Sequence, residues 1–204
     1  MDAVFLYTSM PHADGLRALI FFLDRRPPEA RYPSTITLVR LAELVLTLNT
    51  FEFDGQIFHQ ISGVAIGIKM GPSYACLFKD HLEYRIMESF TGRVPELYKR
   101  YIDDGFGASS RPESVVLDFI YFVKNFHPSV KFTYNISPVS VEFLDIKVNI
   151  KHGKFNTAVF YKPTDAHYYL HFHSSHHLNT NQAFHTLRLR RLCSSDEHFL
   201  LQDD

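Results

Sequence analysis

Two adjacent carboxylates sit inside an apolar, strand-like stretch in the middle of the chain, and no other feature of the sequence constrains the fold as much. The stretch reads "LYKRYIDDGFGAS" and places Asp103 and Asp104 between aromatic residues and two glycines. The pattern predicts two short strands that meet at the acidic pair. Adjacent carboxylates repel each other, and both stay ionised at neutral pH only where a cation screens them. An Asp-Asp-Gly triplet also occurs in ordinary surface turns, so this stretch alone leaves both interpretations open.

The other elements predicted from the sequence alternate between strands and helices. Hydrophobic residues make up 46% of the 204 positions, which is enough for one substantial core. Strands are expected at residues 3–7, 130–136, 141–150 and 155–163, a hairpin at 51–58 around Asp54-Gly55, and helices at 14–23, 34–49, 72–90 and 112–126. The helix at 34–49 is apolar on most of its circumference and is expected to be buried. This order predicts an α+β fold with a largely antiparallel sheet and helices packed on one face.

The sequence carries no signal for a membrane or for secretion. Its longest apolar runs are interrupted by charges and are too short to cross a bilayer. The first ten residues lack the basic flank and the small-residue cleavage site of a secretory signal. Cys76 and Cys193 lack the spacing of a metal site or a disulfide framework, which agrees with a reducing compartment. We therefore expect an intracellular protein, in the nucleus or the cytoplasm, without a membrane partner.

The charges of the chain are nearly balanced, with a formal net charge of −1. This balance argues mildly against binding nucleic acid, because phosphate contacts need Lys and Arg. Between Glu142 and Arg191, however, the chain has seven Lys and Arg residues and only three Asp and Glu residues. This part forms either a basic surface for a polyanion or an ordinary solvated surface.

Carboxylates at a hairpin turn are suited to a divalent metal. Such a turn projects its side chains from the end of the sheet, and Mg2+ takes one or two carboxylates together with substrate phosphates. Two metal ions about 3.5–4 Å apart can clamp the attacking and leaving oxygens of a phosphoryl transfer. The site needs a further carboxylate from a neighbouring strand. Asp2 is a candidate, because it precedes an apolar strand that could lie beside the hairpin.

Six segments follow one another in an order that resembles a known family. They read "DAVFLYTSMP", "QISGVAIGIKMGPSYACLF", "RYIDDGF", "HPSVKFTYN", "VEFLDIKVNI" and "TAVFYKPTD". Together they resemble the palm of reverse transcriptases, most closely those of Penelope-like retroelements, over residues 2–199. The resemblance implies a polymerase-type palm over residues 1–165, truncated at its N-terminus so that the fingers are absent. A linker and the start of a thumb are expected over residues 166–204.

The resemblance implies an RNA-directed DNA polymerase that joins a deoxynucleotide to the 3′-hydroxyl of a primer. Asp2, Asp103 and Asp104 match the family's catalytic carboxylates, and Asp2 and Asp103 are expected to hold Mg2+ or Mn2+. The expected partners are an RNA template, a DNA primer and deoxynucleoside triphosphates. The expected nucleotide contacts are Tyr7, Gln60, Gly63, Gly67 and Lys69, and the expected nucleic-acid contacts are Lys162, Arg188, Arg190 and Arg191.

Each of these motifs also has a plain structural interpretation. Tyr7 fits a core tyrosine on a strand, and the segment 60–72 fits a flexible loop ahead of a helix. The three arginines fit an exposed basic helix end. Phe5, Ile68 and Gly105 depart from the residues usual in the family, which suggests a relaxed or decaying copy.

A second function therefore stands beside the polymerase. It is a non-catalytic, decayed or co-opted retroelement fragment that at most binds nucleic acid. The two functions differ in one structural observation, because a shared metal site needs Asp2 to lie close to Asp103. An Asp2 that is frayed away from the hairpin would exclude the enzyme.

Overall fold

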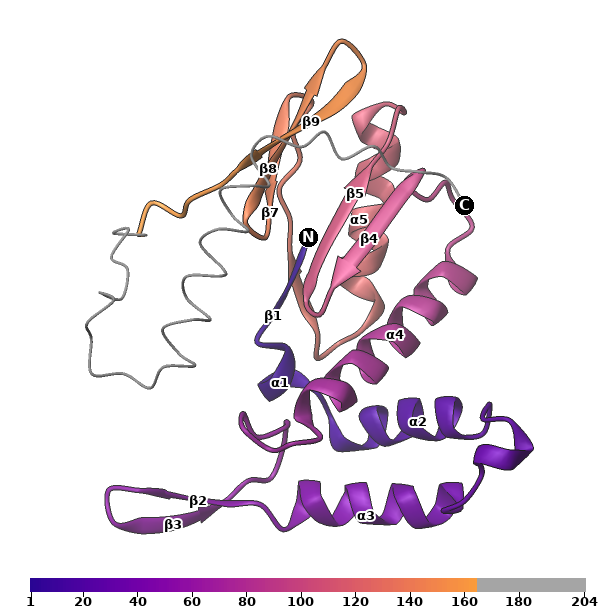
Figure 1. Cartoon of the computed structure of the whole chain (residues 1–204), viewed down its shortest axis with the longest axis vertical. Helices are drawn as coiled ribbons and strands as arrows, with labels where there is room; N and C mark the ends of the chain where they lie inside the picture. The colour runs from indigo at the N-terminus through magenta and orange to yellow at the C-terminus, as the bar shows by residue number, and fades with distance from the viewer. Residues whose placement is uncertain (165–204) are drawn as a thin grey trace, which may run out of the picture. The chain divides into compact units, whose positions relative to one another are not determined.

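The chain folds into two compact units. The structure, a computed structural model, describes residues 1–164 (Figure 1). The first unit comprises Met1–Tyr134 and the second Asn135–Asp204. This division falls earlier in the chain than the boundary at 165/166 that the sequence suggested.

Strands and helices alternate along the first unit. It contains β1 (Asp2–Val4), α1 (Leu6–Ser9), α2 (His12–Leu23), the 3-10 helix η1 (Pro28–Ala30), α3 (Thr35–Thr47), β2 (Thr50–Phe53), β3 (Gln56–His59), α4 (Gly71–Ser89), β4 (Leu97–Tyr101), β5 (Asp104–Ala108), α5 (Glu113–Phe126) and β6 (Lys131–Thr133). No helix among residues 1–164 combines the length and the hydropathy that a membrane span requires.

A four-stranded sheet with the order β4-β5-β1-β6 is the centre of the first unit, and all its strand pairs are antiparallel. Helices α4 and α5 cover one face of this sheet. Tyr98 on β4 shows this, because its hydroxyl donates to Glu83 on α4 and its ring packs on Phe119 of α5. Ala3 on β1 and Phe132 on β6 are buried in the same layer. The expected α+β fold with an antiparallel sheet is confirmed.

Local signals explain several of these elements. The side chain of Ser34 accepts a hydrogen bond from the Thr37 amide and caps the start of α3. Asp54 and Gly55 both adopt positive φ, 50° and 70°, as the tight turn between β2 and β3 requires. Pro72 lies in the first turn of α4. The predicted hairpin at 51–58 and the predicted helices are confirmed to within a few residues.

The first strand is shorter than predicted. The strand expected at residues 3–7 ends at Val4, and Leu6–Ser9 form the short helix α1. Phe5 adopts φ 52° and turns the chain between the two elements. A left-handed conformation is unusual for phenylalanine, so the local pattern gives no sign of it.

Helix α3 is less buried than its apolar sequence predicts. Within it only Ala42 and Leu46 are buried, while the side chain of Ile36 is 82% exposed. The helix packs against α2, and several of its apolar residues remain on the surface of the described chain. Periodicity reports where apolar side chains lie on a helix, but not which element covers them.

The described part of the second unit is a three-stranded antiparallel sheet. It is built from β7 (Ser140–Phe143), β8 (Ile146–Lys151) and β9 (Lys154–Val159) in the order β7-β8-β9. The single strand predicted at 141–150 is wrong, because Leu144 adopts φ 55° and reverses the chain. The next turn, at His152-Gly153, has positive φ at both residues.

Candidate acidic site on the central sheet

Asp2 and Asp104 lie directly opposite each other on the neighbouring strands β1 and β5. Met1 and Gly105 exchange both backbone hydrogen bonds, at 2.8 and 2.6 Å, and the Ala3 amide donates to the Asp103 carbonyl at 3.3 Å. Asp2 and Asp104 therefore form the non-hydrogen-bonded pair between these rungs. In such a pair the Cβ atoms lie about 4.5–5.5 Å apart on the same face of the sheet.

Asp103 lies beside this pair, in the two-residue turn between β4 and β5. The turn joins Tyr101 to Asp104, which are opposite each other in the hairpin. Ile102, the other residue of the turn, adopts φ 50°. The structure thus brings together the three carboxylates that the sequence singled out, and Asp2 is held in the sheet by both β5 and β6.

Strand alternation places the acidic pair on the face of the sheet opposite to α4 and α5. Ala3 points into the helical layer, so its neighbour Asp2 points away from it. The same alternation puts Lys99 on β4 and Lys131 on β6 on the face of Asp2 and Asp104, and both lysines are exposed. Two cations therefore flank the carboxylates on one surface of the first unit.

The carboxylates of this cluster repel one another. Partial burial raises the pKa of Asp2, and the negative charges of Asp104 and Asp103 raise it further. The N-terminal ammonium and Lys79 oppose this rise, but they do not cancel it. The folded chain therefore disfavours the ionised form of Asp2, chiefly through burial and further through the two neighbouring carboxylates.

A buried lysine lies on the other side of the sheet. Lys79 on α4 is 2% exposed, and its ammonium sits 4.3 Å from the centre of the Phe132 ring. Burial lowers the pKa of Lys79 from 10.5 to about 8, while the negative charges of Glu83, Asp103 and Asp2 partly hold it up. No motif in the sequence singles out this residue, because a lone lysine in a helix usually faces solvent. The sequence does hold one sign that Lys79 is buried. It lies four residues before Glu83, on the same face of α4 as the buried apolar residues.

Tyr7 lies on α1, not on a strand, and remains close to the acidic cluster. Its pKa is raised by burial and, to a smaller extent, by the charges of Cys76 and Asp103. The Tyr7 carbonyl accepts a hydrogen bond of 2.7 Å from the Val64 amide. A nucleotide contact by Tyr7 stays a prediction, and the residue is half-buried near the acidic cluster.

The glycine-containing segment before α4 packs its backbone on α1. Gly63 is buried with φ 76°, and a Cβ there would lie 2.9 Å from backbone atoms of Tyr7 and Thr8. Gln60 accepts a hydrogen bond from the Asn49 side chain at 2.6 Å and donates to the Ser62 carbonyl at 2.9 Å. These contacts give Gly63 and Gln60 structural roles.

Other residues predicted to contact nucleotide or nucleic acid are less constrained. Gly67, with φ 106°, and Lys69 are exposed near the start of α4, and their predicted contacts remain untested. Lys162 is exposed in the second unit. Arg188, Arg190 and Arg191, with the rest of the expected thumb over 166–204, lie outside the described residues.

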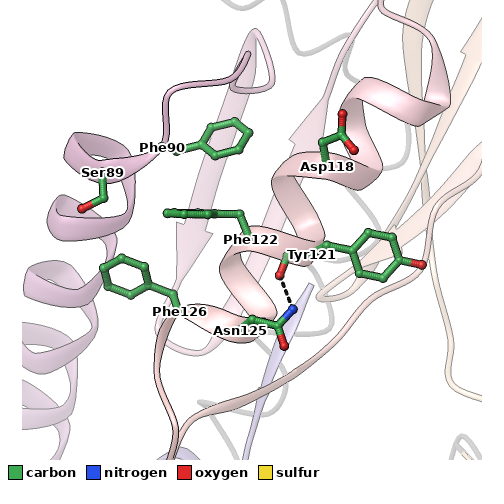
Figure 2. A pocket seen from close by; sticks show the side chains of 7 residues that line it. All are labelled: Ser89, Phe90, Asp118, Tyr121, Phe122, Asn125 and Phe126. Carbon is green, nitrogen blue, oxygen red and sulfur yellow. Dashed lines mark hydrogen bonds between the residues drawn. The ribbon is translucent and has the colours of Figure 1, made fainter.

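One hollow on the surface of the first unit lies away from the acidic cluster. Figure 2 shows it between the end of α4 and α5, where the rings of Phe90, Phe122 and Phe126 lie side by side. Asn125 donates to the Tyr121 carbonyl at its rim. Asp118 is the one carboxylate among the residues that line it. The hollow offers no cluster of reactive groups.

Oxygen donors alone make up the acidic site, which is the donor set that Mg2+ and Mn2+ prefer. Among residues 1–164, no three or more His, Cys, Asp or Glu side chains come together closely enough to hold a metal by themselves. The residues fit a metal that is held by two carboxylates and completed by oxygens of a bound substrate or water. Comparisons with models of protein families, with curated proteins and with solved structures found no match.

Proposed function

We propose that this chain is an RNA-directed DNA polymerase domain, and that Asp2, Asp103 and Asp104 form its catalytic site. One observation carries the proposal: Asp2 and Asp104, from distant parts of the sequence, lie opposite each other in adjacent strands, with Asp103 in the neighbouring turn. The six segments that resemble reverse transcriptases support a polymerase-type palm. The resemblance also supplies the substrates, an RNA template, a DNA primer and deoxynucleoside triphosphates.

The residues of the site have separate tasks in this reaction. The primer 3′-hydroxyl oxygen attacks the α-phosphorus of a deoxynucleoside triphosphate, a new P–O bond forms, and the bond to pyrophosphate breaks. The proton of the hydroxyl passes to water. Asp2 and Asp103 would hold a divalent metal, which would supply positive charge beside the phosphates and the attacking oxygen. Lys99 and Lys131, on the same face of the sheet, attract the anionic backbone. Catalysis then rests on positioning and on electrostatic stabilisation.

Primer extension on an RNA template tests this function. The purified chain is incubated with a DNA primer, deoxynucleotides and Mg2+ or Mn2+, beside the variants Asp103→Asn and Asp118→Asn. Asp118 is an exposed aspartate on α5 that lines the hollow of Figure 2, so it serves as the matched control. We expect Asp103→Asn to lower the rate by about 100-fold or more and Asp118→Asn to leave it unchanged.

Two results would reject the proposal. Extension that persists in Asp103→Asn would show that the acidic turn does not carry the reaction. If the unmodified chain extends no primer with either metal, the chain is the non-catalytic alternative, a fragment that at most binds nucleic acid.

A further inference from the structure

Arg100 joins the acidic turn to helix α4. It lies on β4, one residue before the strand ends at Tyr101, and its side chain is only 13% exposed. Its Nε donates to Glu83 Oε2 at 2.8 Å, and its Nη2 donates to Asp80 Oδ1. Both carboxylates belong to α4. The guanidinium is therefore fixed by two partners on one rigid element, with the planar fork that suits Arg and not Lys.

The third nitrogen of the same guanidinium contacts the turn between β4 and β5. Arg100 Nη1 donates to the carbonyl of Ile102 at 2.8 Å. Ile102 adopts φ 50°, a left-handed conformation that a β-branched side chain strongly disfavours. Such a conformation persists only where the surroundings hold it in place. The hydrogen bond from Arg100 is a contact that holds it, directly next to Asp103.

Glu83 is itself fixed from a second side. Tyr98, two residues before Arg100 on β4, donates its hydroxyl to Glu83 Oε1 at 2.7 Å. Each oxygen of the Glu83 carboxylate thus has one partner from β4, Tyr98 or Arg100. The strand that leads into the acidic turn is held against α4 by a partly buried network of hydrogen-bonded charges.

We propose that Arg100 is a positioning residue, which latches the Ile102–Asp103 turn to α4 and so fixes the Asp103 carboxylate relative to Asp2. This inference rests on the proposed function for its effect on catalysis. The latch itself is a property of the fold that can be measured without metal or substrate. Arg100 makes no hydrogen bond or ion pair with the side chains of Asp2, Asp103 or Asp104, and it acts through the backbone carbonyl of Ile102 in the turn.

Hydrogen exchange of the full chain, without metal or nucleotide, tests the latch. The variant Arg100→Lys keeps the charge but loses the fork. Arg111→Lys is the control, because Arg111 Nε also donates to a glutamate, Glu96 Oε1, at 2.8 Å near the other end of the same hairpin. We expect amides of the turn to exchange about tenfold faster in Arg100→Lys and at the normal rate in Arg111→Lys. An unchanged rate in a folded Arg100→Lys variant overturns the inference.

Primer extension then tests the consequence for the site. Arg100→Lys is expected to raise the Mg2+ concentration needed for half-maximal extension and to lower the rate by up to about 100-fold, with the primer KM unchanged. Adding Ile102→Asn should restore part of the activity, because asparagine adopts the left-handed conformation readily. Loss without rescue, or an equal loss in Arg111→Lys, contradicts a positioning role.

The two proposals can fail separately. If the unmodified chain neither extends primers nor binds Mn2+, the proposed function fails, and hydrogen exchange alone decides whether the latch exists. Should Arg100→Lys not fold, Asp80→Asn removes only the outer and more exposed anchor. It is expected to speed exchange of the turn in the same direction by a smaller factor, and an unchanged rate there overturns the latch.

Discussion

Lys79 is the most unusual single residue of the described chain, since its ammonium is buried beneath the sheet that carries the acidic cluster. Burial lowers its pKa from 10.5 to about 8, so at pH 7 the folded state holds a costly buried charge. The unfolded chain binds this proton up to pH 10.5, whereas the folded chain releases it near pH 8. The stability of the fold therefore increases with pH between these two values.

Replacing Lys79 by methionine should remove this cost. We expect Lys79→Met to be more stable than the unmodified chain at pH 7 by up to about 3 kcal/mol, and the difference to narrow by about 2 kcal/mol at pH 9.5. Denaturant unfolding at the two pH values measures both quantities. Lys99→Met is the control, because Lys99 is exposed on the opposite face of the sheet. A Lys79→Met difference that is the same at both pH values would contradict the assignment of a buried charge.

Among the strands, β5 can pack closely against β1 and β4 because it carries a glycine, Gly105, at the point of contact. A Cβ on Gly105 would lie 3.2 Å from the Tyr98 hydroxyl and 3.3 Å from the Met1 carbonyl. The Tyr98 hydroxyl donates a hydrogen bond to Glu83, and the Met1 carbonyl accepts one from the Gly105 amide, next to Asp2. The glycine at this position therefore fits the close packing around the acidic pair.

Gly105→Ala should destabilise the fold, while Gly107→Ala on the same strand should not. The alanine at 105 must displace Tyr98 or β1, at a cost of about 1–3 kcal/mol. A Cβ on Gly107 has its nearest neighbour, the Leu97 carbonyl, at 3.5 Å, which is an ordinary contact. Free energies of unfolding from urea titrations compare the two variants. Equal stability of Gly105→Ala and Gly107→Ala would show that the strands have room to adjust.

The elements that the sequence predicted are those whose signals are local. Asp54-Gly55 defines its hairpin within four residues, and Ser34 and Pro72 mark helix starts by their own chemistry. The strand breaks at Phe5 and Leu144 escaped prediction, because both residues adopt positive φ without any residue type that favours it.

The candidate site was predictable only in part, for a similar reason. Asp103 and Asp104 stand out in the local pattern, but the pairing of Asp2 with Asp104 joins distant segments. The position of Asp2 before an apolar strand made it a candidate, and the resemblance to reverse transcriptases suggested the same residue. Arg100 and Lys79 escaped prediction, because each is buried by contacts with an element that is distant in the sequence. Spacing along one strand or helix does not carry that information.

At the scale of the whole molecule, the proposed catalytic residues belong to one unit. Asp2, Asp103 and Asp104 lie within Met1–Tyr134, together with the latch residue Arg100. The second unit contributes the exposed Lys162 and the strands β7 to β9. The chemistry of the site is thus expected to depend on the central sheet and on α4, the helix that supports its turn.

The proposed function depends on the binding of a divalent metal to the acidic site. Titration with Mn2+, followed by electron paramagnetic resonance, measures this binding. We compare the full chain with Asp2→Asn, Asp103→Asn and, as the control, Asp54→Asn in the turn between β2 and β3. We expect Asp2→Asn and Asp103→Asn each to weaken Mn2+ binding by at least about tenfold, and Asp54→Asn to leave it unchanged. Mn2+ binding that is equally strong in all four proteins would contradict this expectation.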